Sequence, residues 1–426
     1  MTSLSDKIRT QYEAYPYPRR RPEDERVRLI PTVGDNLEAI NHYGFRGEQD
    51  FGRGFRALVA GGGTGDAAIY LAEQLRASGG GVTYLDMSDR AAEIAKQRAQ
   101  VRGLSNIEWL SADILDLDDM SLPPFDYINC SGVLHHLKDP EQGLAILSRA
   151  LQPAGAMYLM LYGRYGRTAI YPTQKMLRLL TAQDPDLAAK IGTARKVLAD
   201  LPATNGFRRD FEAWRGELDP DGGGDAGLVD LLLHEQDRAY DVEEALEFSR
   251  SCGLHFVDFI GPDKRNYEPE RHITDEAVLQ RVSSLPQEAR WQVAELLFGQ
   301  ITKHQFYLSK ITDSQARLTD PGAAIVLSDA LAGKHHQLAQ AIKPGAAAKI
   351  GISVDGQLRE CVIEGTRSLQ RLVGFFDGTT ALRDAVDICR KEFPTVTEAT
   401  LFGEIRRVFD LFHPVGCAYL RKSRTP

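Results

Sequence analysis

The chain has 426 residues, of which 43% are hydrophobic, and its formal net charge is -8 with a pI of about 5.8. This length predicts two domains or one domain with large insertions, and the acidic balance disfavours a protein that holds nucleic acid through a broadly basic surface. The five cysteines are scattered without a CxxC pair, so they suggest neither a disulfide framework nor a thiolate zinc site and fit a reducing cytoplasm.

The N-terminal segment, residues 1–54, is rich in tyrosine and proline. Its stretch "QYEAYPYPRRRPEDE" favours an extended polyproline II conformation over a helix. If Tyr12, Tyr15 and Tyr17 stayed in solvent, they would lose the gain from burying their rings, so we expect the segment to fold against the rest of the chain. It has no apolar core of a signal peptide, and no later stretch reaches the roughly 18 apolar residues of a membrane span. We therefore expect a cytoplasmic protein without membrane contact.

Residues 55–162 alternate short apolar runs with helical patterns. The runs "FRALVA", "VTYLDMS", "NIEWLSADI", "FDYINCSGV" and "GAMYLMLY" predict strands. Between them, "DAAIYLAEQLRAS", "DRAAEIAKQRAQVRGL" and "DPEQGLAILSRALQPAG" predict helices, the last capped by Asp139 with Pro140 at its first position. This alternation predicts a doubly wound α/β domain whose ligand lies outside the carboxyl ends of parallel strands.

A glycine-rich loop, "GGGTG" at residues 61–65, separates the first strand from the first helix of this domain. Glycines at such a turn permit positive φ and a close approach of the backbone to a ligand. The order fits G-x-G-x-G, but the third glycine of a dinucleotide motif is replaced by Asp66 or Ala67. An acid at the helix N-terminus also disfavours a pyrophosphate, so the loop predicts a ligand without phosphate.

Five segments in order, "LVAGGGTGD", "VTYLDMS", "LSADILDL", "FDYINCSGVLHHLKDP" and "LQPAGAMYLMLY", resemble the successive motifs of class I S-adenosylmethionine-dependent methyltransferases of a bacterial type with an N-terminal YPYP segment. The resemblance implies a Rossmann-like seven-stranded sheet that ends in an antiparallel hairpin, S-adenosylmethionine as cofactor, and methyl transfer by in-line displacement. It also implies that the YPYP segment covers the cofactor. One position departs from the family, because Val59 stands where an acid commonly helps to hold the cofactor's amino group.

The resemblance assigns roles to residues around the cofactor. Asp86 would accept both ribose hydroxyls. Met87 would lie against the adenine, Asp113 would accept a hydrogen bond from the adenine amino group, and Ile114 would provide apolar cover. The complete predicted cofactor-binding set is Tyr43, Gly61, Gly62, Gly63, Asp86, Met87, Asp113, Ile114, Cys130 and Ser131.

The adjacent residues His135 and His136 raise the question of a metal ion. Neighbouring side chains point in different directions on a helix or a strand, so joint ligation of one ion is disfavoured and we expect no metal. We predict His135, Asp237 and Tyr240 as catalytic candidates, because a base can orient or deprotonate an acceptor. The predicted substrate-binding residues are Tyr15, Tyr17, His136, Tyr162 and Arg164.

The catalytic domain is expected to span residues 55–313, with a helical insertion at about 163–253 that forms the acceptor pocket. Within the insertion, "DPDGGGDAG" predicts a loop and "HEQDRAYDVEEALEFSRSCGL" a helix that begins near Asp241. After it, "LHFVDFIG" and "KHQFYLSK" predict the last two strands. Residues 314–426 predict a small C-terminal α+β domain that resembles a winged helix. Without a dense basic recognition helix, it favours protein contacts or homodimer formation over DNA binding.

The sequence therefore predicts a methyltransferase whose acceptor is a small molecule or a protein or peptide. Two alternatives remain open at this point. One is a noncatalytic scaffold or sensor that binds the cofactor, since Val59 replaces a usual contact. The other is a nicotinamide-dependent oxidoreductase, which the missing third glycine and Asp66 disfavour.

Overall fold

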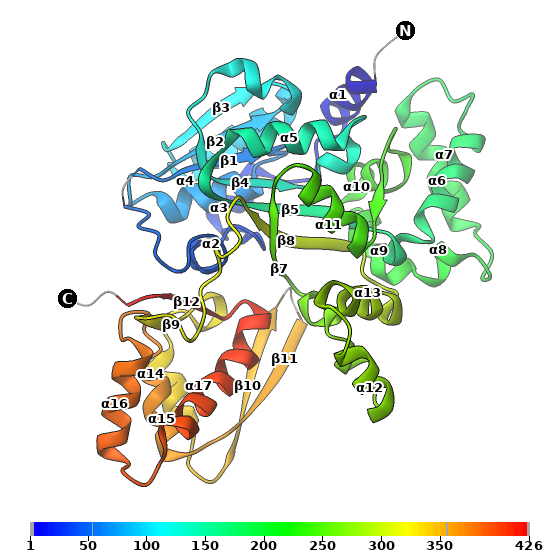
Figure 1. Ribbon diagram of the computed structural model, residues 1–426. Coiled ribbons are helices and arrows are strands. Elements are labelled where there is room, and N and C mark those ends of the chain that lie inside the picture. The colour runs from blue at the N-terminus through cyan, green and yellow to red at the C-terminus, as the bar shows by residue number, and fades with distance from the viewer. Residues whose placement is uncertain (1–3, 53, 355–356, 424–426) are drawn as a thin grey trace.

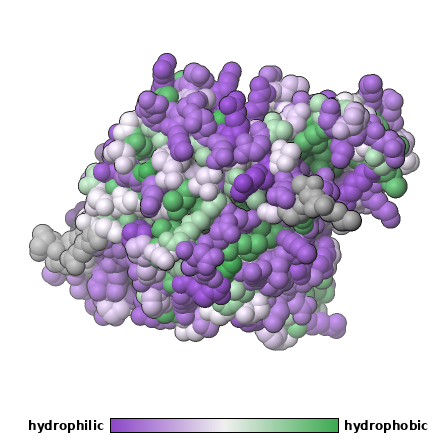
Figure 2. All heavy atoms as spheres, turned by 90° about the horizontal axis from the view of Figure 1, so that it is seen from above, coloured by the Kyte–Doolittle hydropathy of each residue, from purple (hydrophilic) through white to green (hydrophobic). Residues whose placement is uncertain are grey.

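The computed structural model describes residues 4–52, 54–354 and 357–423. Figure 1 shows a central sheet flanked by helices, a helical lobe beside one end of the sheet, and a C-terminal unit below it. The face seen in Figure 2 is mostly hydrophilic, with hydrophobic residues gathered in a band across its middle. None of the helices in the described ranges combines the length and apolar character needed to cross a membrane.

The central sheet has the strand order β3-β2-β1-β4-β5-β8-β7, and the short strand β6 also pairs with β5. Strand β8 runs antiparallel to both of its neighbours, whereas the pairs from β3 to β5 are parallel. The strands are β1 (Arg56–Ala60), β2 (Gly81–Asp86), β3 (Ile107–Ser111), β4 (Phe125–Ser131), β5 (Leu151–Gly163), β6 (Ala239–Tyr240), β7 (His255–Phe259) and β8 (Lys303–Ser309). This arrangement confirms the predicted Rossmann-like α/β fold.

Helices cover both faces of the sheet. Because successive side chains of a strand point to opposite faces, each strand contributes residues to two separate cores. On β1, Leu58 and Ala60 belong to one core, while Ala57 and Val59 belong to the other. The first core includes residues of α5 (Pro140–Ala150) and α11 (Val242–Ser251). The second includes residues of α2 (Leu37–Gly44), α3 (Asp66–Leu75) and α4 (Asp89–Arg102). The helix starts follow the predicted signals, since Asp139 accepts a hydrogen bond from the Gln142 amide at 2.9 Å.

The N-terminal segment differs from the extended conformation expected for it. Helix α1 (Leu4–Ala14) includes Tyr12, and only the chain after it is without regular structure as far as Arg21. Ile8 and Gln11 are buried on the inner side of α1, which contacts α4. Tertiary packing therefore supports a helix that local composition did not predict.

The insertion is helical, as expected, and has its own apolar core. Its helices are α6 (Ile170–Leu180), α7 (Leu187–Ala199), α8 (Gly206–Arg209), α9 (Phe211–Leu218) and α10 (Gly224–Leu228), followed by a π-helical turn at Val229–Leu233. The expectation of a loop over "DPDGGGDAG" was wrong for its second half, because α10 begins at Gly224. A Cβ on Gly227 would lie 2.1 Å from the Glu217 carbonyl oxygen, so this glycine lets α10 pack tightly against α9.

Two helices, α12 (Glu276–Ser283) and α13 (Gln287–Phe298), lie between β7 and β8. The C-terminal unit follows with its own apolar core. It comprises β9 (Ala323–Leu327), α14 (His335–Ala341), β10 (Ala347–Val354), β11 (Gln357–Glu364), α15 (Arg367–Val373), α16 (Leu382–Glu392), α17 (Glu398–Phe412) and β12 (Ala418–Lys422). Strand β12 pairs with β9, and β10 and β11 form a hairpin. The likeness to a winged helix stays a prediction.

Aromatic rings join the C-terminal unit to α2 and the central sheet. Tyr419 of β12 belongs to the core beneath α2, where Tyr43 stacks on Tyr307 with ring centroids 4.9 Å apart. His413 follows α17 and lies 3.1 Å from the Tyr43 hydroxyl. The C-terminal unit therefore covers aromatic side chains of α2 and β8 while keeping a core of its own.

We expect a fragment of residues 314–426 to unfold cooperatively on its own, because its core draws on its own strands and helices. Circular dichroism during heating measures this directly. The complementary fragment, residues 1–313, should melt below the full chain because it exposes Tyr43 and Tyr307. A C-terminal fragment without a cooperative transition would contradict the predicted domain boundary.

Candidate active site

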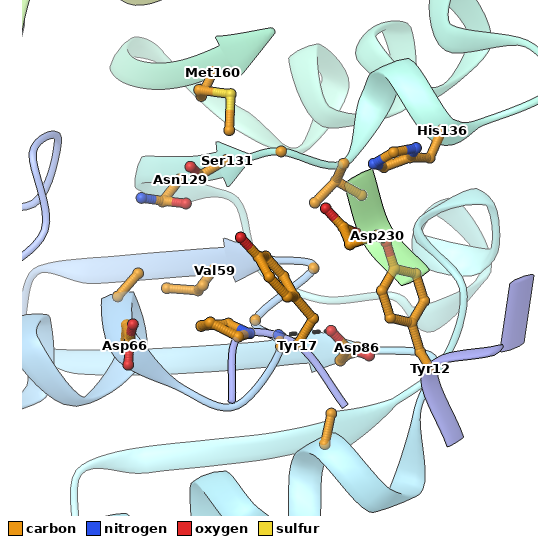
Figure 3. Close-up of a pocket in the computed structure, with 18 of the residues that line it drawn as sticks. Tyr12, Tyr17, Val59, Asp66, Asp86, Asn129, Ser131, His136, Met160 and Asp230 are labelled. Carbon is orange, nitrogen blue, oxygen red and sulfur yellow. Dashed lines mark hydrogen bonds between the residues drawn. The ribbon is translucent and has the colours of Figure 1, made fainter. Parts of the chain in front are cut away.

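A cavity of about 670 Å³ opens at the carboxyl ends of β1, β2, β4 and β5. This volume lies within the usual range for small-molecule sites. The glycine-rich turn and the strand ends form one side, and α1 with the chain that follows it forms another. Figure 3 shows Tyr17 extending into the middle of this cavity, with Asp86 nearby and Met160 across from it.

The turn between β1 and α3 requires glycine at two of its positions. Gly61 and Gly63 have φ of 77° and 50°, a region that glycine adopts without strain. A Cβ on Gly61 would lie 2.3 Å from Val133 Cγ2, and one on Gly63 would lie 2.6 Å from the Tyr17 carbonyl oxygen. Side chains at these positions would therefore displace Val133 in the cavity wall and the segment that carries Tyr17.

Asp86 connects the glycine turn to the end of β2. One carboxylate oxygen accepts the Gly63 amide at 2.7 Å and the other accepts the Ser88 amide at 2.8 Å. Burial raises the pKa of Asp86, and these hydrogen bonds oppose the rise. Each oxygen retains acceptor capacity toward the cavity, as the proposed ribose contact requires.

The residues predicted to surround the adenine also line the cavity. Met87, Asp113 and Ile114 line it together with Leu4 and Ile8 of α1. Asp113 accepts the Leu115 amide at 3.0 Å and the Ser5 hydroxyl at 2.9 Å. Helix α1 therefore lies over the position predicted for the adenine.

Residues 4–26, here called the N-terminal strap, are fastened to the glycine turn by backbone hydrogen bonds. The Thr64 amide donates to the Tyr17 carbonyl at 3.3 Å, and the Thr64 hydroxyl donates to the Pro18 carbonyl at 2.7 Å. At the C-terminal end of α1, Glu13 accepts the amides of Asp89 and Arg90 at the start of α4. The strap thus contacts both sides of the cofactor half of the cavity.

A buried ionic network anchors the same strap. Arg98 is 1% exposed and lies 2.5 Å from Glu25 and 2.7 Å from Asp66. Arg20 also pairs with Asp66, at 2.6 Å, and Arg102 pairs with Glu25. Asp66 therefore serves the strap, and the pKa of its carboxyl is lowered by Arg20 and Arg98 despite burial.

A second part of the cavity, here called the anionic arm, is formed by Trp214, Glu217, Asp230 and Leu231 of the insertion. Tyr17 donates to Glu217 at 2.9 Å. Asp230 accepts the hydroxyl of Tyr12 at 2.9 Å and that of Tyr162 at 3.1 Å. Asp230 lies on the π-helical turn, a rare conformation that is frequent at functional sites.

His136 presents a free ring nitrogen to this part of the cavity. Its Nδ1 lies 2.9 Å from the Gln236 carbonyl and therefore carries the proton, which leaves the Nε2 lone pair without a partner among the described residues. Figure 3 shows His136 on the same side of the cavity as Tyr12 and Asp230. The position suits a proton acceptor.

His136, Asp230 and His234 also lie close enough to be considered as metal ligands, with candidate atoms within 4.8 Å of one another. However, His234 Nδ1 accepts the Gln236 amide at 3.1 Å, so its Nε2 carries the proton when the ring is neutral. The rings of His136 and His234 are also stacked, with their centroids 3.8 Å apart. The lone pairs of their nitrogens lie in the ring planes, so the lone pairs of the two rings lie in similar planes and do not point toward each other. This hydrogen-bond pattern disfavours joint ligation.

Two of the predicted catalytic residues, His135 and Tyr240, are buried in the interior of the protein. His135 is fully buried against Tyr162, with ring centroids 3.8 Å apart, and burial lowers its pKa well below the usual value. Tyr240 lies on β6 and packs on Phe248 in a sheet core. Neither lines the cavity, because His136 faces it in place of His135 and β6 directs Tyr240 toward α11.

The remaining polar candidates of the insertion are used for structure. Asp237 is 1% exposed, accepts the Gln174 amide at 3.0 Å and pairs with Arg167 at 3.5 Å. Arg164 pairs with Asp241 at 2.7 Å and with Glu244 outside the cavity. Neither Asp237 nor Arg164 lines the cavity, and their predicted roles stay predictions.

Three other predicted residues also lie outside the cavity. Tyr15 packs against the apolar core of the insertion. Tyr43 faces Tyr307 and His413 because α2 turns that side toward the C-terminal unit. Cys130 points into a sheet core, opposite to its neighbours on β4, and burial raises the pKa of its thiol to about 12.

The predicted residues that the structure brings together around the cavity are Gly61, Gly62, Gly63, Asp86, Met87, Asp113, Ile114, Ser131, Tyr17, His136 and Tyr162. Sequence reasoning missed Tyr12, Asp35, Glu217 and Asp230. Of these, Asp230 had a signal, since it is a lone acid in the apolar run "LVDLLL". Glu217 and Asp35 stand in ordinary polar surroundings in the sequence and gave no such signal.

Comparison with known proteins agrees with this geometry. A family model described as "Methyltransferase domain" matches residues 58–157. Residues 58–157 therefore form a class I S-adenosylmethionine-dependent methyltransferase domain, with S-adenosylmethionine as the cofactor. It is 32% identical over 316 residues to the uncharacterized protein syc1184_c of Synechococcus sp. (strain ATCC 27144 / PCC 6301 / SAUG 1402/1), across 72% of each chain. The methyltransferase domain and the relatives named as methyltransferases support an enzyme of this class over the nicotinamide and noncatalytic alternatives.

Two further proteins are similar to this chain, one in part of its sequence and the other in its fold. The tRNA 5-carboxymethoxyuridine methyltransferase of Escherichia coli (strain K12) is 35% identical over 112 residues, which span 26% of this chain and 41% of that enzyme. The structure of PKMT2 from Rickettsia typhi in complex with AdoHcy has a TM-score of 0.62 at 13% identity, covering 96% of this chain and 76% of that one. The latter likeness concerns the fold alone.

Proposed function

We propose that the enzyme transfers the methyl group to an amine nitrogen bound in the anionic arm. The observation that carries this proposal is the pair of carboxylates, Glu217 and Asp230, surrounded by aromatic side chains. Burial raises the pKa of Glu217, and the charge of Asp230 contributes to the rise. An ammonium group would relieve this repulsion.

Two cations also reach this region. Arg167 is held against the ring of Tyr162, 3.5 Å from its centroid, and pairs with Asp237. Lys303 lines the cavity from the exposed start of β8. Because Asp237 pairs with Arg167, Lys303 is the one of these two cations left to oppose Glu217 and Asp230. The two carboxylates therefore keep an excess of negative charge, which favours a cationic acceptor.

The reaction requires the bound ammonium to lose a proton before its nitrogen can attack. When bound, S-adenosylmethionine supplies a sulfonium methyl group, to which the nitrogen bonds as the carbon–sulfur bond breaks and its electron pair stays on sulfur. His136 Nε2 accepts the proton of the ammonium, and Nδ1 remains bonded to the Gln236 carbonyl. Glu217 and Asp230 hold the acceptor, so positioning and exclusion of water supply most of the rate.

The acceptor amine belongs to a small molecule or to a protein or peptide under this proposal. The relatives named as a tRNA methyltransferase and as ubiquinone biosynthesis O-methyltransferases share only about a quarter of this chain, so their acceptors do not carry over. The net charge of -8 supports a partner other than nucleic acid. Free cysteines support a cytoplasmic location, and the C-terminal unit is proposed to contact a partner protein or a second copy.

The test uses methyl-labelled S-adenosylmethionine with a cell extract separated into macromolecular and small-molecule fractions. Label on nitrogen survives mild alkali, whereas a methyl ester loses it. Glu217→Gln should lower transfer about 10- to 100-fold, since a charged hydrogen bond to the acceptor is lost. Affinity for AdoHcy, measured by calorimetry, should stay unchanged.

Glu212→Gln provides the matched control, because Glu212 is an exposed residue of the same helix α9. Asp230→Asn should act like Glu217→Gln, with Asp225→Asn as its exposed counterpart on α10. Alkali-labile label, or equal activity of Glu217→Gln and Glu212→Gln, would refute an amine acceptor in the anionic arm.

A further inference from the structure

The cavity wall carries charges of both signs that do not pair with one another. Within the described ranges, the hydrogen-bond partners of Glu217 and Asp230 are tyrosine hydroxyls. Lys303 lines the same cavity, and in the part of the chain that the structure describes no carboxylate lies within ion-pair distance of its ammonium group. The cavity therefore offers both a positive and a negative partner to one ligand.

The register of the sheet places Lys303 beside the anionic arm. Lys303 on β8 is the antiparallel partner of Tyr162 on β5, so the two side chains stand next to each other on one face of the sheet. Tyr162 in turn donates to Asp230 at 3.1 Å. Burial raises the pKa of Glu217, and the positive charge of Lys303 is among the influences that oppose the rise. Lys303 therefore acts on the same part of the cavity as the two carboxylates without pairing with either.

A second hydrogen-bond donor lies on the same face of β8. Gln305 is two residues after Lys303, and side chains at this spacing point to the same side of a strand. Its register partner is Met160, which Figure 3 shows facing the cavity. Gln305 is 4% exposed and lines the cavity, and its Oε1 accepts the Tyr158 hydroxyl at 2.9 Å. Its Nε2 has no acceptor among the described residues, so it remains free to donate to a ligand oxygen.

The charges indicate which anionic group these two donors would bind. One lysine and one neutral amide match a group of single charge with two oxygens, which is a carboxylate. A phosphate group carries close to two negative charges at neutral pH, and the neighbouring Glu217 and Asp230 would repel it. A lysine side chain of a protein acceptor would bring neutral peptide groups to β8 and leave the charge of Lys303 without a partner.

We propose that the acceptor is a zwitterionic small molecule, an amino acid or a close analogue, whose carboxylate binds Lys303 and Gln305 while its amine occupies the anionic arm. This inference rests on the proposed amine acceptor and adds a second charged group to it. His136 accepts the ammonium proton. The nitrogen then bonds to the methyl carbon as the carbon–sulfur bond breaks and its electron pair stays on sulfur. Lys303 and Gln305 take no part in that step and set which amines are bound.

The charge of the labelled product tests the proposal before the acceptor is identified. A cell extract is labelled with the enzyme and methyl-labelled S-adenosylmethionine, and its small-molecule fraction is separated by electrophoresis near neutral pH. The separation is repeated after esterification in acidic methanol, which removes the negative charge of a carboxylate. The labelled product should then move farther toward the cathode.

The other results separate this inference from the proposed function. Alkali-stable label that moves as a cation both before and after esterification, or that enters the macromolecular fraction, would refute the zwitterion and leave an amine acceptor in place. An alkali-stable product that stays anionic after esterification would replace the carboxylate by a phosphate and would also refute it. Label lost in mild alkali would contradict the amine acceptor itself.

Substitutions at Lys303 test the contact on β8. Lys303→Met should raise the amount of small-molecule fraction needed for half-maximal transfer about 10- to 100-fold, because one charged hydrogen bond is lost, with the maximal rate unchanged. Lys303→Arg keeps the charge and should retain most of the affinity. Lys175→Met, an exposed substitution on α6 of the insertion, is the matched control. AdoHcy affinity in calorimetry should be the same in all three variants.

Lys138 provides a direct comparison, since it also lines the cavity and has no ion-pair partner among the described residues. A loss in Lys138→Met in place of Lys303→Met would put the carboxylate at the other wall and overturn the assignment. Equal half-saturation of Lys303→Met and Lys175→Met would also overturn it, as would a loss of AdoHcy affinity that accounts for the whole effect.

Discussion

Asp86→Ala is expected to weaken AdoHcy binding by about 2–4 kcal/mol, or about 30- to 1,000-fold. The substitution removes the acceptor proposed for both ribose hydroxyls. It also removes the partner of the Gly63 and Ser88 amides, so the glycine turn loses its link to the end of β2. Isothermal titration calorimetry measures the change.

Asp86→Asn separates the two causes, because an amide oxygen can still accept one of the backbone amides while the charge is lost. It should show an intermediate loss. Asp118→Ala, an exposed acid paired with Arg149, serves as the control and should bind AdoHcy normally. If Asp86→Ala bound AdoHcy as the unaltered protein does, Asp86 would not belong to the ribose site.

The second large effect concerns stability. Arg98→Met should lower the free energy of unfolding by about 3–5 kcal/mol, because it leaves buried carboxylates without their shared cation. Glu25 and Asp66 would keep only Arg102 and Arg20, respectively. The Thr64 carbonyl would also lose the Arg98 hydrogen bond at 2.7 Å. Urea unfolding monitored by circular dichroism gives the difference.

Arg90→Met is the matched control for this prediction, since Arg90 is exposed on the same helix α4. Its unfolding free energy should stay within about 0.5 kcal/mol of the unaltered value. Similar losses for Arg90→Met and Arg98→Met would mean that the ionic network does not anchor the strap. Limited proteolysis should cut the strap faster in Arg98→Met alone.

The parts of the site that could be predicted come from short contiguous segments. The glycine turn and Asp86 each follow a strand directly, so the strand–turn–helix pattern fixes both their place and their exposure to the ligand. The start of α5 at Asp139 was likewise local. The absence of an acid at Val59 was also visible in the sequence, but the cofactor contact that would replace it stays a prediction.

The parts that could not be predicted depend on contacts between distant segments. Tyr12 meets Asp230, and Tyr17 meets Glu217, across about two hundred residues of chain. Asp237 was chosen from the correct stretch, but the π-helical turn directs Asp230 into the cavity instead. Periodicity cannot foresee a π-helical turn, because it inserts one residue into the helical repeat.

The N-terminal strap has a kinetic consequence. Tyr12 and Tyr17 belong at once to the cover of the cofactor and to the wall of the anionic arm. We therefore expect an ordered sequence in which the cofactor enters first and the closing strap then completes the acceptor site. The spent cofactor leaves last, after the strap has lifted from Thr64. The lifetime of those strap contacts, more than the chemistry, would then set the upper limit of turnover.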